Sequence, residues 1–171
     1  LQIGLIHYNS DNNEDALYAY KTVVEKFAGS SEFRNALIGI ETIYMSMHME
    51  DEYFTYIKGL GDIANISVSK KDSLTYMSAE QLYLSGDCTG SADHFKKYIN
   101  KFKDGNYLLD AHYYKADCNM QAGNESDALE SYEYIISRPR NMFTEEALLK
   151  AGRINFKNSR YSDALENFKM L

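Results

Sequence analysis

The sequence predicts an all-α fold built from about five antiparallel helix hairpins. Four segments read alike, because each places a small residue four positions before an aromatic residue and therefore on the same helix face. These pairs are Ala16 with Tyr20, Ser91 with Phe95, Ala128 with Tyr132, and Ala164 with Phe168. A degenerate fifth copy has Glu52 and Tyr56. The five copies follow one another at spacings of 36, 39, 37 and 36 residues, which is typical of repeated helix pairs.

A second set of mostly small residues lies twelve positions before the first residue of each copy. It consists of Gly4, Ile40, Ala79, Ala116 and Gly152. Across both sets, eight of the ten positions hold Gly, Ala or Ser. Because small residues let two helices approach closely, each copy predicts two antiparallel helices that cross at these positions, with the aromatic ring beside the crossing.

The turn and capping residues between the expected helices fit this repeat length. One array is expected, with repeats at residues 1–30, 31–69, 70–106, 107–141 and 142–171. Turn residues separate repeats at 29–31, 104–106 and 138–140. Helical apolar spacing over 74–86 and 109–123 ends at glycine, the residue preferred just after a helix. Residues 59–73 are either an extended second helix or a loop between repeats. Expected N-cap residues are Asp87, Asn124 and Thr144.

Composition excludes several classes of protein. Hydrophobic residues make up 44% and charged residues 25% of the 171 positions, with one proline, which is typical of a folded chain and not of a disordered or collagen-like one. No apolar run approaches the length of a transmembrane helix, so we expect no direct membrane insertion. The formal net charge of −7 argues against nucleic acid as a partner.

In these residues the chain resembles the tetratricopeptide repeat family, whose pattern places Gly in the first helix and Ala, then an aromatic residue, in the second. Gly4 and Gly152 match the glycine, with Ala79 and Ala116 substituting, while Ile40 and Glu52 depart from the pattern and Trp is absent throughout. The resemblance covers the whole chain and implies a right-handed α-solenoid, an α-α superhelix.

Two further expectations concern context. No polar capping element is visible at either end, which favours a fragment of a longer repeat protein. Short segments such as residues 98–102 resemble the sequences of bacterial cell-envelope members of the family. That narrower resemblance implies a periplasmic or outer-membrane-associated protein, with the cytoplasm as the alternative.

The search for catalytic chemistry predicts no enzyme, no cofactor and no metal site. The four histidines are scattered, and no metalloprotease, serine-hydrolase or phosphate-loop motif occurs. They are His7, His48, His94 and His112. The two cysteines, Cys88 and Cys118, fall in neighbouring repeats and could approach one another, but we expect free, half-buried thiols.

The predicted function is non-catalytic binding of a protein or peptide segment. The family resemblance implies that positions of the first helices around the small residue line a concave groove. This expected site consists of Tyr44, Tyr76, Glu80, Tyr83, Tyr113, Asp117, Met120, Arg153 and Phe156. Tyr and Met suit recognition because they bury a large area, and the carboxylates favour a partner with apolar anchors and some basic charge.

Two alternatives stay open at this point. Several of these tyrosines could pack against the next repeat rather than face a partner. The array could also be a structural spacer or assembly arm in a larger envelope protein, with contacts made by its convex face or its ends.

Overall fold

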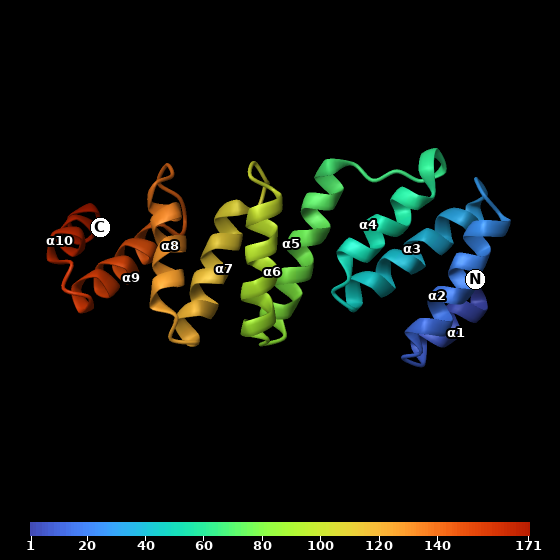
Figure 1. Cartoon of the computed structure of the whole chain (residues 1–171), viewed down its shortest axis with the longest axis horizontal. Coiled ribbons are helices and arrows are strands. Elements are labelled where there is room, and N and C mark those ends of the chain that lie inside the picture. Colours follow the sequence, from blue (N-terminus) through green and yellow to red (C-terminus); the bar gives the residue numbers. More distant parts are fainter. The chain divides into compact units, whose positions relative to one another are not determined.

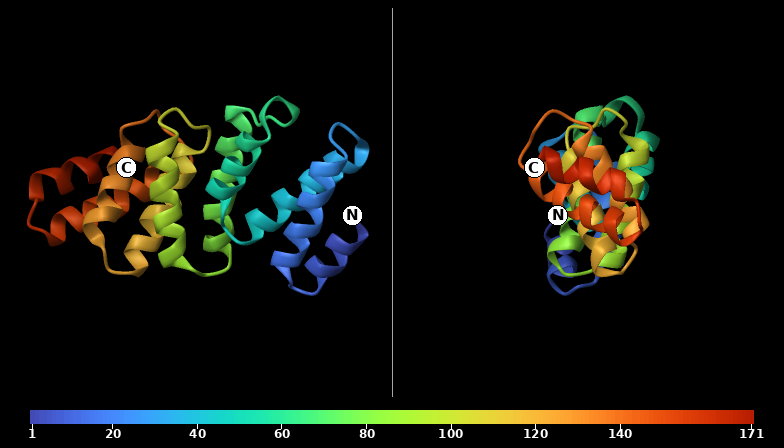
Figure 2. Two further views of the ribbon diagram at one scale, coloured as in Figure 1. Left: turned by 45° about the vertical axis from the view of Figure 1, so that its right-hand side comes forward. Right: turned by 90° about the vertical axis from the view of Figure 1, so that its left-hand side faces the viewer.

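The computed structural model describes residues 1–171 as α-helices joined by short connections, without a β-strand. The chain divides into two compact units, Leu1–Leu74 and Thr75–Leu171. Within each unit successive helices run in opposite directions (Figure 1), as the two further views in Figure 2 also show. The predicted all-α fold of antiparallel helix pairs is therefore confirmed. None of the helices is both long and apolar enough to cross a membrane.

The first unit contains four helices, a short 3₁₀ helix and the start of a fifth helix. These are α1 (Gln2–Asn9), α2 (Asn13–Lys26), α3 (Ser31–Ser46), α4 (Glu50–Gly59), η1 (Gly61–Ile63) and the first residues of α5 (Val68–Leu84). The second unit contains the rest of α5, then α6 (Cys88–Lys101), α7 (Leu108–Gln121), α8 (Glu125–Ile136), α9 (Thr144–Lys157) and α10 (Tyr161–Met170).

The turns inside the five helix pairs share one backbone feature. Each contains a residue with left-handed φ, between 55° and 85°, and these residues are Asp11, His48, Gly86, Gly123 and Ser159. The two glycines lie where the sequence predicts helix ends, since a residue without Cβ adopts this conformation without strain. The predicted N-cap at Asp87 is also confirmed, because its side chain accepts a hydrogen bond from the backbone N–H of Gly90 at 2.9 Å.

The N-cap position predicted at Asn124 is confirmed without its capping hydrogen bond, and the cap predicted at Thr144 is wrong. Asn124 occupies the N-cap position of α8, but its side chain makes no capping hydrogen bond and its amide donates to Asn119 Oδ1 at 3.5 Å. Thr144 is the first helical residue of α9, so its hydroxyl turns back and accepts from the backbone N–H of Asn141 at 2.9 Å. Residues 59–73 are not an extended second helix, since α4 ends at Gly59 and α5 begins at Val68.

The small residues lie where helices touch. In the first unit the ring of Tyr20 lies between two glycines: a Cβ added to Gly4 would come within 2.9 Å of it, and one added to Gly39 within 2.7 Å. In the second unit, Gly152 faces Phe168 in the same way, at 2.6 Å. Such distances leave no room for a side chain, so the aromatic residue occupies the volume that the small residue leaves.

The other predicted crossing positions behave alike, with one exception. Ala16, Ala79, Ala116, Ala128 and Ala164 are buried, and the hydroxyl of buried Ser91 donates to the carbonyl of Ala79 across the α5–α6 pair at 3.1 Å. Glu52 is exposed. The second helix pair therefore crosses without a small residue at that position, as the degenerate sequence of this copy indicates.

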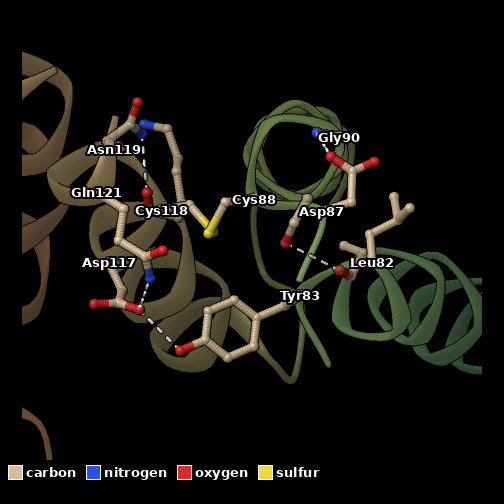
Figure 3. The surroundings of a disulfide bond; sticks show 12 residues. Leu82, Tyr83, Asp87, Cys88, Gly90, Asp117, Cys118, Asn119 and Gln121 are labelled. Atoms are coloured by element: carbon tan, nitrogen blue, oxygen red, sulfur yellow. Dashed lines mark hydrogen bonds between the residues drawn. A yellow bond between two sulfur atoms is a disulfide. The ribbon is translucent and has the colours of Figure 1, made fainter. Parts of the chain in front are cut away.

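The two cysteines form a disulfide, so the expectation of free thiols is wrong. Cys88 is the first residue of α6 and Cys118 lies near the end of α7. Because these helices run antiparallel, the start of one lies beside the end of the other, and the two Cα atoms are 5.0 Å apart (Figure 3). The bond joins two successive helix pairs of the second unit.

Overpacking tests the close crossings. Ala128→Leu places a large side chain at a fully buried crossing on α8 and should lower the free energy of unfolding by about 1–3 kcal/mol. Glu133→Leu, at an exposed position of the same helix, should change it by less than about 0.5 kcal/mol. Urea unfolding followed by circular dichroism measures both. Equal losses in the two variants would mean that α8 does not cross α7 closely at Ala128.

Candidate functional site

The nine predicted site residues divide between the two compact units. Tyr44 belongs to α3 in the first unit, and the other eight lie on α5, α7 and α9 in the second. Tyr44 is a core residue: its side chain is buried, its ring lies 6.2 Å from that of Tyr53, and its hydroxyl accepts a hydrogen bond from Lys21 Nζ at 2.9 Å. Tyr44 therefore contributes to the core of the first unit.

Tyr76 is also largely enclosed. Only 5% of its surface is exposed, and its ring stacks on Tyr107 with the centroids 4.5 Å apart. Its hydroxyl donates a hydrogen bond to Glu80 Oε1 at 2.8 Å, one turn further along α5. This hydrogen bond orients the carboxylate of Glu80 along the helix. Glu80 is partly exposed, whereas Tyr76 is buried.

Tyr83 joins α5 to α7. Its hydroxyl donates to Asp117 Oδ2 at 2.8 Å (Figure 3), and its ring lies 4.6 Å from that of Tyr114. The amide of Gln121 donates to the same carboxylate oxygen at 3.0 Å. Asp117 is thus held by two donors, one from the neighbouring helix pair and one from its own helix.

Tyr113 makes the corresponding contact between α7 and α9. Its hydroxyl donates to Glu146 Oε2 at 2.8 Å, and its ring stacks on Phe143 with the centroids 4.4 Å apart. Sequence reasoning missed Glu146, although it lies 33 residues after Tyr113, much as Asp117 lies 34 after Tyr83. The near-equal separations are the signal that could have revealed it.

The remaining three predicted residues are not part of these contacts. Met120 is partly buried against the α7–α9 core. Arg153 and Phe156 are exposed on α9, and the ring of Phe156 contacts Tyr161 of α10 edge-on, with the centroids 5.4 Å apart. The structure therefore assembles a narrower set, which we term the tyrosine–carboxylate face: Tyr76, Glu80, Tyr83, Tyr113, Asp117 and Glu146.

Negative charge dominates the electrostatics of this face. Burial and the hydrogen bond to Asp117 raise the pKa of Tyr83 to about 12. Burial and the bond to Glu146 raise the pKa of Tyr113 in the same way. Burial, aided by the charge of Glu80, also raises the pKa of the Asp110 carboxyl. At neutral pH the hydroxyls are therefore neutral donors, and the face can accept hydrogen bonds from a cation rather than supply a nucleophile.

The first unit has a related carboxylate that is already paired. Glu41 accepts from the hydroxyl of Tyr53 at 2.6 Å and forms an ion pair with Lys70 at 2.8 Å. Residues 63–66, from the connection between α4 and α5, line a pocket of about 280 Å³ with these side chains and with Leu37. The pocket lies over positions of α3 that the repeat pattern assigns to the groove.

Of the four histidines, His112 has the most unusual surroundings. It is 6% exposed, and its ring stacks on Tyr134 with the centroids 3.7 Å apart. Burial first, and then the charges of Lys115, Arg138 and Lys103, lower the pKa of His112 to about 4. No group of three or more His, Cys, Asp or Glu side chains is arranged to hold a metal ion.

The lowered pKa of His112 makes stability depend on pH. As pH falls from about 6.5 towards 4, the unfolded chain binds a proton at this imidazole and the folded chain does not, so stability falls. His112→Phe keeps a ring on Tyr134 and removes the titration. We expect its melting temperature to decline less than that of the wild type between pH 7 and pH 5. His7→Gln serves as the control, and an unchanged slope in His112→Phe would contradict the assignment.

Comparisons with known proteins find similarity only to solved structures, at low sequence identity. No protein-family model matches the chain. No curated protein matches it either. Among solved structures it is similar to MamA, at 18% identity and a TM-score of 0.47 over 99% of this chain and 92% of that one. It is also similar to YrrB, described as a TPR protein with an unusual peptide-binding site, at 16% identity and a TM-score of 0.45 over 97% and 79% of the two chains.

The helix pairs, their buried small residues and the aromatic rings beside them are thus observed features of this chain. The protein is an all-α chain whose successive hairpins resemble the tetratricopeptide repeat.

Proposed function

We propose that this protein is a non-catalytic binding module, and that its tyrosine–carboxylate face receives a protein segment with apolar anchors and a basic side chain. The aromatic rings supply apolar area, and the carboxylates supply acceptors for Lys or Arg. We also propose that all five helix pairs belong to one right-handed array.

One observation carries the proposal: the chain already makes such a contact within its first unit. Ala64 and Ile66 pack against the core that α3 and α4 form. A few residues later, Lys70 pairs with Glu41 at 2.8 Å. Two apolar side chains and one lysine therefore line a pocket with residues of α3 and α4, the two helices of one repeat. This is the chemistry that we propose for an external partner.

The repeat register extends this observation to the second unit. Glu41 directly follows Ile40, as Glu80 follows Ala79 and Asp117 follows Ala116. In the second unit the hydrogen-bond donors to Glu80 and Asp117 are Tyr76, Tyr83 and Gln121, all of them neutral. An ammonium or guanidinium group of a partner would supply Glu80 and Asp117 with a positive charge, as Lys70 does for Glu41.

A second candidate function is the structural spacer or assembly arm. Large apolar side chains are exposed on α1 and α10, among them Ile3 at 65%, Ile6 at 64% and Leu165 at 54%. Apolar residues grouped on a surface mark contact sites. In this alternative the contacts are made by α1 and α10, and the tyrosine–carboxylate face serves only to join helix pairs.

The disulfide supports a periplasmic or outer-membrane-associated location, which we propose for this protein. Structural disulfides persist in oxidising compartments and are rare in the cytoplasm. Cys88 and Cys118 are 30 residues apart in sequence, and their bond links successive helix pairs. In the cytoplasmic alternative both thiols would be reduced.

Removal of the disulfide provides a test of its contribution. The Cys88→Ala/Cys118→Ala variant should lose about 2–4 kcal/mol of unfolding free energy, since the cross-link restricts the unfolded chain. Dithiothreitol should lower the melting temperature of the wild type and leave that of the variant unchanged. Alkylation of the protein in intact source cells, followed by mass spectrometry, should find both thiols protected; two modified cysteines would contradict an oxidising location.

Binding is tested by selecting random displayed peptides against the full chain. The selected sequences should combine at least one Lys or Arg with apolar residues. Glu80→Gln/Asp117→Asn keeps the acceptors for Tyr76 and Tyr83 and removes two charges. Titration calorimetry should show that this variant binds about tenfold or more weakly, and that wild-type affinity falls as salt is raised.

Asp127→Asn/Glu133→Gln is the matched control, since it removes two exposed charges from α8. It should bind as the wild type does. Acidic selected peptides, or weaker binding in this control and not in the Glu80/Asp117 variant, would contradict the proposal. Binding that is lost only after substitution of Ile3, Ile6 or Leu165 would favour the assembly arm.

A further inference from the structure

One pocket of the second unit is lined by none of the residues of the tyrosine–carboxylate face. It has a volume of about 660 Å³ and lies between the α6–α7 connection, residues 103–106, and the α8–α9 connection, residues 138–141. Pockets of roughly 300–1,000 Å³ are typical of sites for small molecules. A ligand of that size therefore fits the space between the two connections.

The charge of this pocket is opposite to that of the chain as a whole. Lys103, Arg138 and Arg140 line it, against one acidic side chain, Asp104. The formal net charge of the protein is −7, so a group of three basic residues around one cavity is a local exception. Their field also reaches the buried imidazole beneath the pocket, since Arg138 and Lys103 contribute to the lowered pKa of His112.

The guanidinium of Arg138 lies over one aromatic ring. Its central carbon lies 4.5 Å from the centroid of the Tyr134 ring, and that ring stacks in turn on His112 at 3.7 Å. A guanidinium that stacks on a ring by its face keeps its N–H donors at the edge. Arg138 can therefore present two parallel donors to an oxyanion without loss of its stacking contact.

The other two basic side chains are also positioned by neighbours. Arg140 pairs with Glu145 at 2.6 Å, and Lys103 Nζ donates to Asn100 Oδ1 at 3.3 Å. Asp104 and Glu145 balance part of the positive charge but not all of it. The excess favours one anionic group in the pocket and disfavours a metal cation.

Part of the remaining wall is apolar, although Asn106 and Asn141 also line the pocket. Leu108 and Leu109 from the start of α7, together with Pro139 and the ring of Tyr134, line the same cavity. A free inorganic anion would leave this surface without a partner. A ligand that carries its oxyanion on a compact apolar group would cover both parts of the pocket.

We propose that this pocket binds a small organic anion, with a phosphate or carboxylate group on Arg138 and Lys103 and an apolar moiety against Leu108, Leu109 and Pro139. The two oxyanions share the chemistry that a guanidinium recognises. The site is separate from the tyrosine–carboxylate face, so this inference does not rest on the proposed binding of a protein segment.

Calorimetric titration of the full chain with four probes tests the proposal: phenyl phosphate, benzoate, neutral benzamide and inorganic phosphate. We expect saturable binding of phenyl phosphate, benzoate or both, with weaker binding of inorganic phosphate and none of benzamide. Comparison of the first two probes decides between phosphate and carboxylate. The NMR signals of Tyr134 and His112 should shift during the titration, because these rings support Arg138.

Lys103→Gln/Arg138→Gln should weaken binding by at least about tenfold. Arg160→Gln/Lys169→Gln, which removes two exposed positive charges elsewhere in the second unit, should bind as the wild type does. Circular dichroism establishes that both variants fold. The proposal is overturned if neither anion saturates, if both variants bind equally, or if benzamide binds as well as benzoate. Equal affinity for inorganic and phenyl phosphate would overturn the role of the apolar wall.

Discussion

The close crossing of two helices within each pair is the constraint on which the rest of the structure depends. In four of the five pairs a small residue lies at the crossing with a large ring beside it, and Tyr20 of α2 fills the space that Gly4 of α1 and Gly39 of α3 leave. Because interiors are packed to nearly crystalline density, these residues fix how far apart the helices lie. The distance between the two helices of a pair decides which side chains of the next pair they can contact. The contacts between successive pairs therefore depend on it.

The tyrosines take part both in packing and in the recognition that we propose. Tyr83 and Tyr113 reach from one helix pair to a carboxylate of the next, so they join the pairs and at the same time hold Asp117 and Glu146 in position. A role in packing therefore does not exclude the proposed role of these side chains in binding. A carboxylate fixed by a neutral donor keeps its full charge for a partner, as Glu41 does for Lys70.

Charge is divided by location within the second unit. Carboxylates gather on the first helices of its repeats, and basic residues gather around the pocket between two connections. Tyrosine hydroxyls orient the carboxylates, and the face of the Tyr134 ring orients the guanidinium of Arg138. The two proposed sites would therefore take ligands of opposite charge.

The sequence by itself determined the all-α class, the helix pairs and the small residues at their crossings, because these depend on local periodicity and on residue size. It also placed the turns at Gly86 and Gly123, where only backbone conformation matters. Only the tertiary structure decided that Cys88 and Cys118 form a disulfide, that Tyr44 is buried, and that Tyr113 reaches Glu146. Each of these depends on which helices lie side by side and at what offset, and a periodic pattern within one helix carries no information about that offset.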